Sequence, residues 1–243
     1  ADFTKPLNAV APGVFSIHGN EGIKDAALEH YMALNPKGAI SRGYPDATGI
    51  EGVFTGEKGD KWEPQNDNDD PNVTDTAKIN TKAIDGYIAE CKAYGTEPIL
   101  CCHGIQYGGP KWLWKDGHGL SEATDRDAAE VAEMVAAYLE HANRGHKGSP
   151  TYELNMKYVD LGNEPELDHK SLAGWLRIVR AVGQRVHRDY PGVLVGSYCP
   201  YQMRYIRQLL DEAGDQIDWL SFHPYGWTPS EFYRFTDEMK KKL

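Results

Sequence analysis

KYVDLGNEPE, residues 157–166, begins as a short apolar run and ends in a polar turn. An apolar run of this length, bounded by Gly, Asn and Pro, is typical of a buried β-strand. Similar runs recur along the chain at 13–18, 38–42, 98–103, 193–198 and 217–223. The sequence therefore predicts six strands, each followed by a loop marked by polar residues, glycine or proline.

Amphipathic patterns typical of helices lie between the predicted strands, with apolar residues three or four positions apart. The second consists of Ala83, Tyr87, Cys91 and Tyr94, the third of Ala128, Val131, Val135, Tyr138 and Ala142, and the fourth of Leu172, Trp175, Val179, Val182 and Val186. Thr124 is the predicted N-cap of the third helix. Thr228, Pro229 and Glu231 are typical of a capped first turn, and we expect this last helix to run to the end of the chain.

Strands that alternate with helices predict a parallel sheet covered by helices, either doubly wound or closed into a barrel. The first predicted strand leads into HGNEG, residues 18–22, and not into the glycine pattern of a dinucleotide-binding turn. Polar or aromatic residues follow nearly every predicted strand: His18, Arg42, Tyr44, His103, Asn163, Glu164, Tyr198, His223 and Tyr225. Because these strand ends meet on the active-site face of a barrel, we expect an α/β fold of the (β/α)8 TIM-barrel class.

The length of the chain conflicts with a complete barrel, which has eight strands and about 250 residues, or more when its loops are long. The 243 residues contain only six predicted strand-helix units, because one loop at about 43–74 is long. We therefore expect residues 1–243 to form a single, partial TIM-barrel domain, truncated after the sixth unit. A missing C-terminal segment or self-association would complete the barrel and cover its exposed edges.

Composition excludes several classes of partner. Lys and Arg number 26 against 36 Asp and Glu, a formal net charge of −10, so no basic surface for nucleic acid or an anionic membrane is expected. No apolar run approaches the roughly 18 residues of a membrane span. The chain does not begin with Met, which leaves room for a removed leader, so this end does not reveal the compartment. The location stays open, with a secreted or periplasmic one favoured over a cytoplasmic one.

Glu164 is the strongest candidate for chemistry. It lies at the end of a predicted strand, beside Asn163 and before Pro165, which restricts the turn. A carboxylic acid in this place can act as a general acid while the amide of Asn163 binds a hydroxyl group. The simpler alternative is an ordinary acidic residue that precedes the next helix.

GNEP, residues 162–165, resembles the acid/base motif of the clan A retaining glycoside hydrolases, which are eight-stranded barrels. Arg42, His103 and FHPY at 222–225 resemble the sugar-site positions of that clan on the second, third and sixth strands. LGNEP is similar both to the heparanase-like glucuronidases and to the xylosidase/iduronidase group. The resemblance implies that Glu164 is the acid/base and that Asn163 binds the sugar 2-hydroxyl.

The resemblance also implies a catalytic nucleophile, a Glu at the end of a seventh strand and about 5–5.5 Å from the acid/base. The sequence predicts no seventh strand, so no nucleophile is assigned within residues 1–243. Glu231 is explained by its capping position three residues after Thr228. Glu166 is expected to point into the following loop or to begin the next helix. The chain alone is therefore expected to be inactive or nearly so.

Three tryptophans are further candidates for sugar binding, because indole rings stack on the C–H faces of sugars. Trp112 and Trp114 follow the third predicted strand, and Trp227 follows the sixth. Each could form the wall of a subsite or pack its own loop, and we expect Trp112 and Trp114 to divide these roles. Trp175, on a helical stripe, and Trp219, inside a strand, are expected in the core.

Structural roles are also open to the other strand-end residues. Arg42 could belong to a structural ion pair, and either His103 or His223 could be a buried core histidine. Because both histidines follow barrel strands, we favour a role in substrate binding. Tyr225 would pair with a carboxylate or a sugar hydroxyl.

No cofactor is expected, because the sequence lacks the His-x-His and His-Glu-x-x-His spacings of catalytic metal sites. The acidic and amide residues at 66–75 could hold Ca²⁺, but they lack the spacing of an EF-hand loop, and a solvated loop is the simpler interpretation. The expected partner is a carbohydrate substrate. The alternative function is a carbohydrate-binding barrel without turnover, or an inactive barrel fragment.

Overall fold

The computed structural model describes residues 40–41, 88, 97–102, 113–114, 119–144, 156–162, 164–165, 171–198, 202–221 and 223–242. The strands in these ranges are β1 (Ile40–Ser41), β2 (Glu97–Cys101), β3 (Tyr158–Asp160), β4 (Leu194–Tyr198) and β5 (Trp219–Ser221). The α-helices are α4 (Asp125–Leu139), α6 (Ala173–Asp189), α7 (Met203–Ala213) and α8 (Pro229–Lys242). Single turns η4 (Leu120–Glu122), η5 (Glu140–Arg144) and η6 (Gly214–Gln216) flank them.

The strands form one parallel sheet in the order β1-β2-β3-β4-β5. A doubly wound sheet reverses its strand order at a switch point, and the described strands contain no such reversal. The predicted α/β class and the five predicted strands from 38–42 onward are confirmed. The predicted strand at 13–18 and the helix predicted around 83–94 lie outside the described residues, apart from Ile88.

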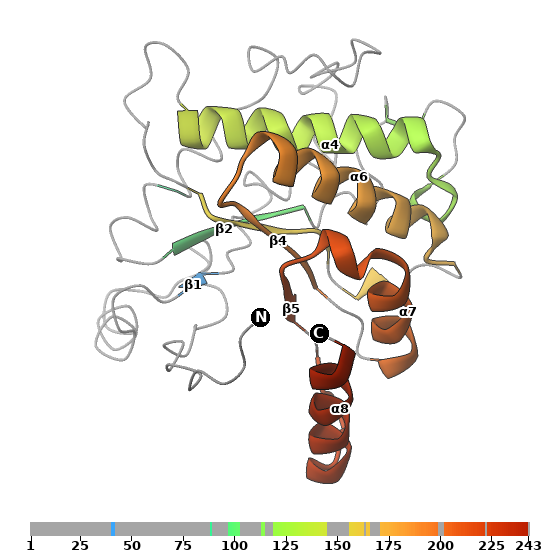
Figure 1. Cartoon of the computed structure of the whole chain (residues 1–243). Helices are drawn as coiled ribbons and strands as arrows, with labels where there is room; N and C mark the ends of the chain where they lie inside the picture. Colours follow the sequence, from blue (N-terminus) through green and yellow to red (C-terminus); the bar gives the residue numbers. More distant parts are fainter. Residues whose placement is uncertain are drawn as a thin grey trace, which may run out of the picture.

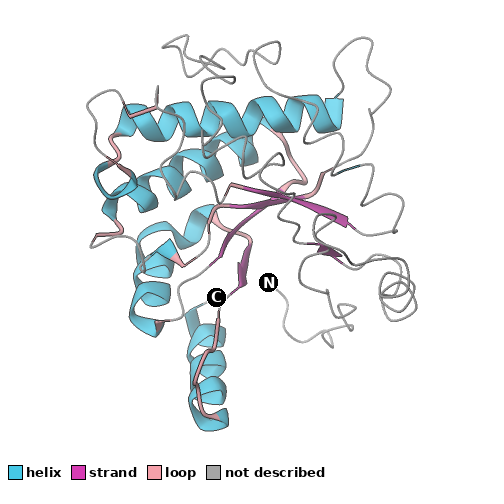
Figure 2. Ribbon diagram, turned by 180° about the vertical axis from the view of Figure 1, so that it is seen from behind, coloured by secondary structure: helices cyan, strands magenta, loops and turns pink. Residues whose placement is uncertain are grey.

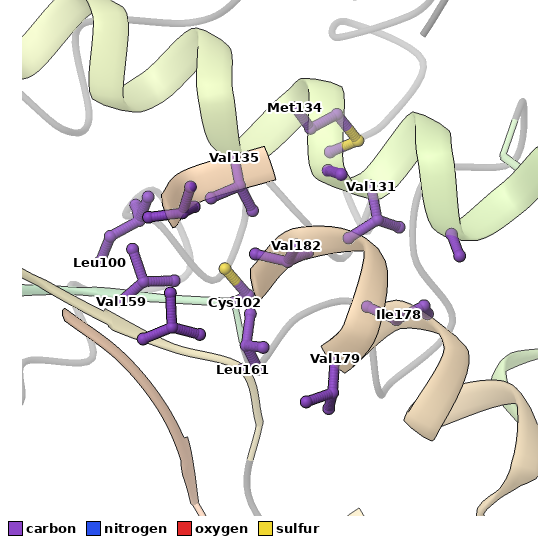
Figure 3. Close-up of a cluster of buried hydrophobic side chains, with 14 of the residues drawn as sticks. Leu100, Cys102, Val131, Met134, Val135, Val159, Leu161, Ile178, Val179 and Val182 are labelled. Atoms are coloured by element: carbon purple, nitrogen blue, oxygen red, sulfur yellow. The ribbon is translucent and has the colours of Figure 1, made fainter. Parts of the chain in front are cut away.

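Helices α4 and α6 lie side by side over one face of the sheet (Figure 1), and the view from behind shows the same layers (Figure 2). Their apolar stripes meet the apolar side chains of the central strands. Figure 3 shows this core, with Leu100, Cys102, Val131, Met134, Val135, Val159, Leu161, Ile178, Val179 and Val182 labelled. The two helical patterns predicted over these ranges are confirmed, because every apolar residue named for them is buried.

Both predicted helix starts are capped as expected. Thr124 N donates to Asp127 Oδ2 at 2.8 Å, and the Thr124 hydroxyl accepts from the Asp127 amide, which closes a capping box on α4. Thr228 N donates to Glu231 Oε2 at 2.7 Å, and Glu231 N donates to Thr228 Oγ1 at 3.3 Å. These hydrogen bonds from Thr228 lower the pKa of the Glu231 carboxyl, so Glu231 is the capping residue that its spacing predicted.

The opposite face of the sheet is different in character. Successive strand residues alternate between faces, so Asp160, Gly196 and Trp219, which are paired in register, lie on the face away from α4 and α6. A Cβ atom on Gly196 would lie 2.0 Å from Trp219 Cε2, so the indole covers this glycine directly. The expectation that Trp219 belongs to the core is wrong in this respect: it is half-buried on the other face, whereas Trp175 is in the core as predicted.

In the described part of the chain, no helix is long and apolar enough to cross a membrane. Cys102 is buried. Helix α8 projects away from α4 and α6 at the C-terminal end (Figure 1).

Candidate active site

Glu164 occupies an unusual backbone position just beyond β3. Its φ is 47°, and among the described residues it is the one non-glycine residue with a positive φ. Such a conformation costs a residue other than glycine on the order of 1–3 kcal/mol, and it occurs preferentially at functional sites. Pro165, which is buried, disfavours the right-handed helical conformation for the residue before it. The chain therefore turns sharply at Glu164 itself.

The Glu164 side chain reaches across the sheet to His223. Oε1 of Glu164 and Nδ1 of His223 form a hydrogen bond, and both side chains are largely buried, at 14% and 15% exposure. Glu164 follows β3 and His223 follows β5, so the pair spans the end of β4, which lies between them. Two residues predicted from separate strand ends are thus in direct contact.

One tautomer of His223 suits both protonation states of Glu164. With a proton on Nδ1, the imidazole donates to Oε1 when the carboxyl group is ionised. It can donate to the same oxygen when the carboxyl group carries its proton on Oε2. In this tautomer, Oε2 is the oxygen that can release or take up a proton.

A tight turn carries Tyr225 against His223. Trp227 N donates to Pro224 O at 3.2 Å, and Gly226 has a φ of 70°, which a glycine adopts without strain in the third position of a type II turn. The Tyr225 and His223 ring centroids lie 4.7 Å apart with planes inclined at 41°. Tyr225 is 67% exposed, so its ring covers part of the imidazole and presents the rest of its surface outward.

The backbone before Glu164 is held from three sides. Cys102 N donates to Asp160 O at 2.8 Å, and Leu161 N donates to Gly196 O at 3.2 Å, which ties the strand end to both neighbouring strands. Trp175 Nε1 of α6 donates to Leu161 O at 3.4 Å. The turn that carries Glu164 therefore starts from a rigid base.

Asp160 is the residue of this region that sequence reasoning missed. Its side chain is buried, and Oδ1 accepts a hydrogen bond from Gly162 N at 3.3 Å. The available signal was a carboxylate inside an otherwise apolar strand, because burying an acidic group is costly unless it forms hydrogen bonds.

The remaining predicted residues fall into two groups. Trp114 lies in the hydrophobic core, and Trp227 is half-buried with its ring 5.1 Å from that of Phe235 in α8, edge to face. In these positions Trp114 and Trp227 pack their own loops against the core, which is the structural one of their two predicted roles. Outside the described residues lie Asn163, Arg42, His103, Trp112 and the acidic stretch 66–75. Within the described ranges, no group of three His, Cys, Asp or Glu residues could hold a metal ion.

No protein-family model and no curated protein matches the chain. Among solved structures, it is similar to a glucosidase from Croceicoccus marinus, with a TM-score of 0.52 and 19% identity over 71% of this chain and 36% of that one. It is also similar to family 51 α-L-arabinofuranosidases from Bifidobacterium longum and Thermotoga petrophila RKU-1. These two give TM-scores of 0.48 and identities of 16% and 17%, over 94% and 95% of this chain and 49% and 50% of theirs.

The chain thus spans between about a third and a half of the length of these structures. The likeness to the glucosidase is one of fold. It supports an α/β fold, in agreement with the sequential parallel sheet.

Proposed function

We propose that this chain carries the acid/base part of a retaining glycoside hydrolase, with Glu164 as the proton donor. The observation that supports the proposal most directly is the Glu164–His223 pair at the carboxyl ends of parallel strands. In barrel enzymes the active site lies at this end of the sheet. The similarity in fold to a glucosidase agrees with this placement.

In the proposed first step, a carboxylate nucleophile attacks the anomeric carbon while Glu164 donates its proton to the departing glycosidic oxygen. In the second step, ionised Glu164 takes a proton from water, which attacks the same carbon and releases the sugar from the nucleophile. His223 holds Oε1 through both steps, so that Oε2 exchanges the proton. Asn163 is proposed to bind the sugar 2-hydroxyl.

We assign no nucleophile within residues 1–243; by the resemblance, the nucleophile is a Glu at the end of a seventh strand. A retaining mechanism needs the two carboxyl groups about 5–5.5 Å apart. The Glu231 carboxylate accepts a hydrogen bond from Thr228 N at the N-terminus of α8. Among the described residues, the hydrogen-bond partner of the Glu164 carboxyl group is His223. Residues 1–243 alone are therefore expected to bind sugar poorly and to turn it over slowly or not at all.

The sugar contacts of the proposed site come from several strand ends. Arg42, His103 and Trp112 are proposed to bind the sugar from the second and third units of the barrel. Tyr225 is proposed to form an aromatic platform beside His223, because its ring is exposed and aromatic rings stack on sugars. Trp114 and Trp227 are less suited to this role, since both pack against the core.

The test uses Glu164→Gln in the full-length protein, with phenyl and 2,4-dinitrophenyl glycosides of glucose, xylose, arabinose and glucuronic acid. The amide cannot donate a transferable proton, so kcat/KM on the phenyl glycosides should fall by about 100-fold to 10,000-fold. On dinitrophenyl glycosides, whose leaving group needs no acid, kcat/KM should change little, whereas kcat should fall because the amide cannot act as the base of the second step. Added azide should then restore turnover of the dinitrophenyl glycosides by replacing the activated water.

Glu231→Gln is the matched control, and its kinetics should equal those of the wild type. Equal activity of Glu164→Gln and the wild type on a phenyl glycoside would refute the assignment. If the full-length protein binds a glycan with no turnover, and Glu164→Gln binds it equally well, the chain belongs to a carbohydrate-binding barrel. The exposed ring of Tyr225 beside a polar pair is the observation that favours this second candidate.

A further inference from the structure

We propose that Asp160 is a positioning residue, whose buried carboxylate sets the turn that aims Glu164 at His223. The inference rests on the proposed function for its kinetic test, because Asp160 acts through Glu164. Its structural test is independent of any activity. The proposal combines the hydrogen bond from Gly162 to Asp160, the positive φ of Glu164 and the Glu164–His223 contact.

The side chain of Asp160 does not contribute to the packing of the hydrophobic core. Asp160 is the last residue of β3, it is paired in register with Cys101 and Gly196, and it lies on the face away from α4 and α6. Its side chain has no solvent exposure. A buried carboxylate is retained without loss of stability only where hydrogen bonds compensate for the lost water. The position therefore calls for an explanation in terms of what the side chain binds.

The side chain binds the backbone of the turn. Gly162 N donates to Asp160 Oδ1, a contact between a residue and the second residue after it, as in an Asx turn. The main chain of Asp160 and Leu161 is already fixed by Cys102 and Gly196. The carboxylate thus determines the direction in which the chain leaves β3.

Glu164 follows only two residues after Gly162, and its own backbone is in an unfavourable conformation. A turn that starts in a fixed direction is what allows this conformation to persist, since Pro165 and the contact with His223 restrain the other side. Without the Asp160 acceptor, Gly162 and Glu164 can relax, and the carboxyl group then swings away from the imidazole.

The first experiment compares Asp160→Ala with Asp160→Asn in the full-length protein, on phenyl and dinitrophenyl glycosides. Asn keeps an Oδ1 acceptor, so its kinetics should stay within a few-fold of the wild type. Ala removes the acceptor, so kcat/KM on phenyl glycosides should fall by about 100-fold, as expected for a misplaced general acid. On dinitrophenyl glycosides the loss should be several-fold at most. Equal losses on both leaving groups would mean a merely structural role and would overturn the proposal.

The second experiment needs no turnover. The low-field imidazole N–H resonance of His223, identified by its loss in His223→Asn, reports the hydrogen bond to Glu164. It should be present in the wild type and in Asp160→Asn and be absent or shifted toward water in Asp160→Ala. Asp160→Val, which leaves no cavity and has no acceptor, replaces the alanine variant if thermal unfolding shows that the latter does not fold.

The two experiments separate the two proposals. If the wild type hydrolyses no glycoside but the His223 resonance responds to Asp160→Ala, the proposed function fails and the positioning role stands. If the wild type is a glycosidase and the resonance is unchanged in Asp160→Ala, the positioning role fails and the function stands.

Discussion

The two faces of the parallel sheet differ in what their side chains do, although the residues alternate along the same strands. On the helix face, Leu100 and Val159 are completely buried against α4 and α6, and Val195 is completely buried in the same core. On the other face, β4 exposes Leu194 at 39%, and Asp160, Gly196 and Trp219 form a mixed polar and aromatic layer. The helix face therefore holds the fold together, and the opposite face carries the candidate chemistry.

This division explains why the site can tolerate strain. The free energy that stabilises the domain comes mainly from apolar surface buried between sheet and helices. Glu164, with its unfavourable backbone conformation, lies at the end of the sheet, and the buried carboxylate of Asp160 lies on the other face. The stability supplied by the helix face compensates for the cost of both. Functional sites commonly carry such costs because the surrounding structure compensates for them.

The largest effect is expected when two leucines on opposite faces of the sheet are compared. Leu100→Ala should lower the free energy of unfolding by about 2–5 kcal/mol, because it leaves a cavity among fully packed side chains. Leu194→Ala, its control on the other face, should cost less than about 1 kcal/mol, since this side chain is partly exposed. Urea denaturation of both variants measures the difference. Similar costs for the two substitutions would mean that the faces are equivalent in stability.

The features that the sequence could predict were those governed by local pattern. Residues 157–162 and 193–198 read as strands because they are short, apolar and bounded by turn residues, and Thr124 and Thr228 mark helix starts through their own hydrogen bonds. The strand-end rule brought Glu164 and His223 to one edge of the sheet, and the structure brings them into contact.

The features that the sequence did not predict depend on contacts between segments that are distant in sequence. Strands of parallel sheets often show little alternation in sequence, so nothing local indicates which face meets the helices. Trp219 was therefore assigned to the core, and Asp160 was not singled out at all. The positive φ of Glu164 results from contacts of several segments with one turn, so the residue type alone does not predict it.

An intermediate effect on stability is expected at Gly196, a residue without a side chain that is covered directly by the Trp219 ring. An added methyl group would meet the Trp219 ring at 2.0 Å, so Gly196→Ala should force the indole to move, at a cost of about 1–3 kcal/mol. The tryptophan fluorescence spectrum should change as Trp219 shifts. Gly214→Ala is the matched control, because its methyl group would meet only Leu210, at 3.8 Å. An unchanged stability and spectrum for Gly196→Ala would contradict the packing of this layer.

The smallest effect is expected at Glu231, an acidic residue remote from the polar face. Because hydrogen bonds from Thr228 lower its folded-state pKa, the ionised carboxylate stabilises α8 above the unfolded pKa of about 4.3. This contribution is lost as the pH falls through the lower folded-state pKa. Glu231→Gln should therefore reduce the melting temperature slightly at pH 7, and the difference from the wild type should shrink as the pH falls from 7 toward 3.

The same variant sharpens the contrast between the two glutamates. Glu164 serves the proposed chemistry because of the turn and the histidine that hold it, whereas Glu231 serves the start of a helix. Thermal unfolding from pH 3 to pH 7 should consequently separate Glu231→Gln from the wild type while glycoside turnover does not. A loss of turnover in Glu231→Gln at unchanged stability would mean that α8, and not a later strand, supplies the second carboxylate.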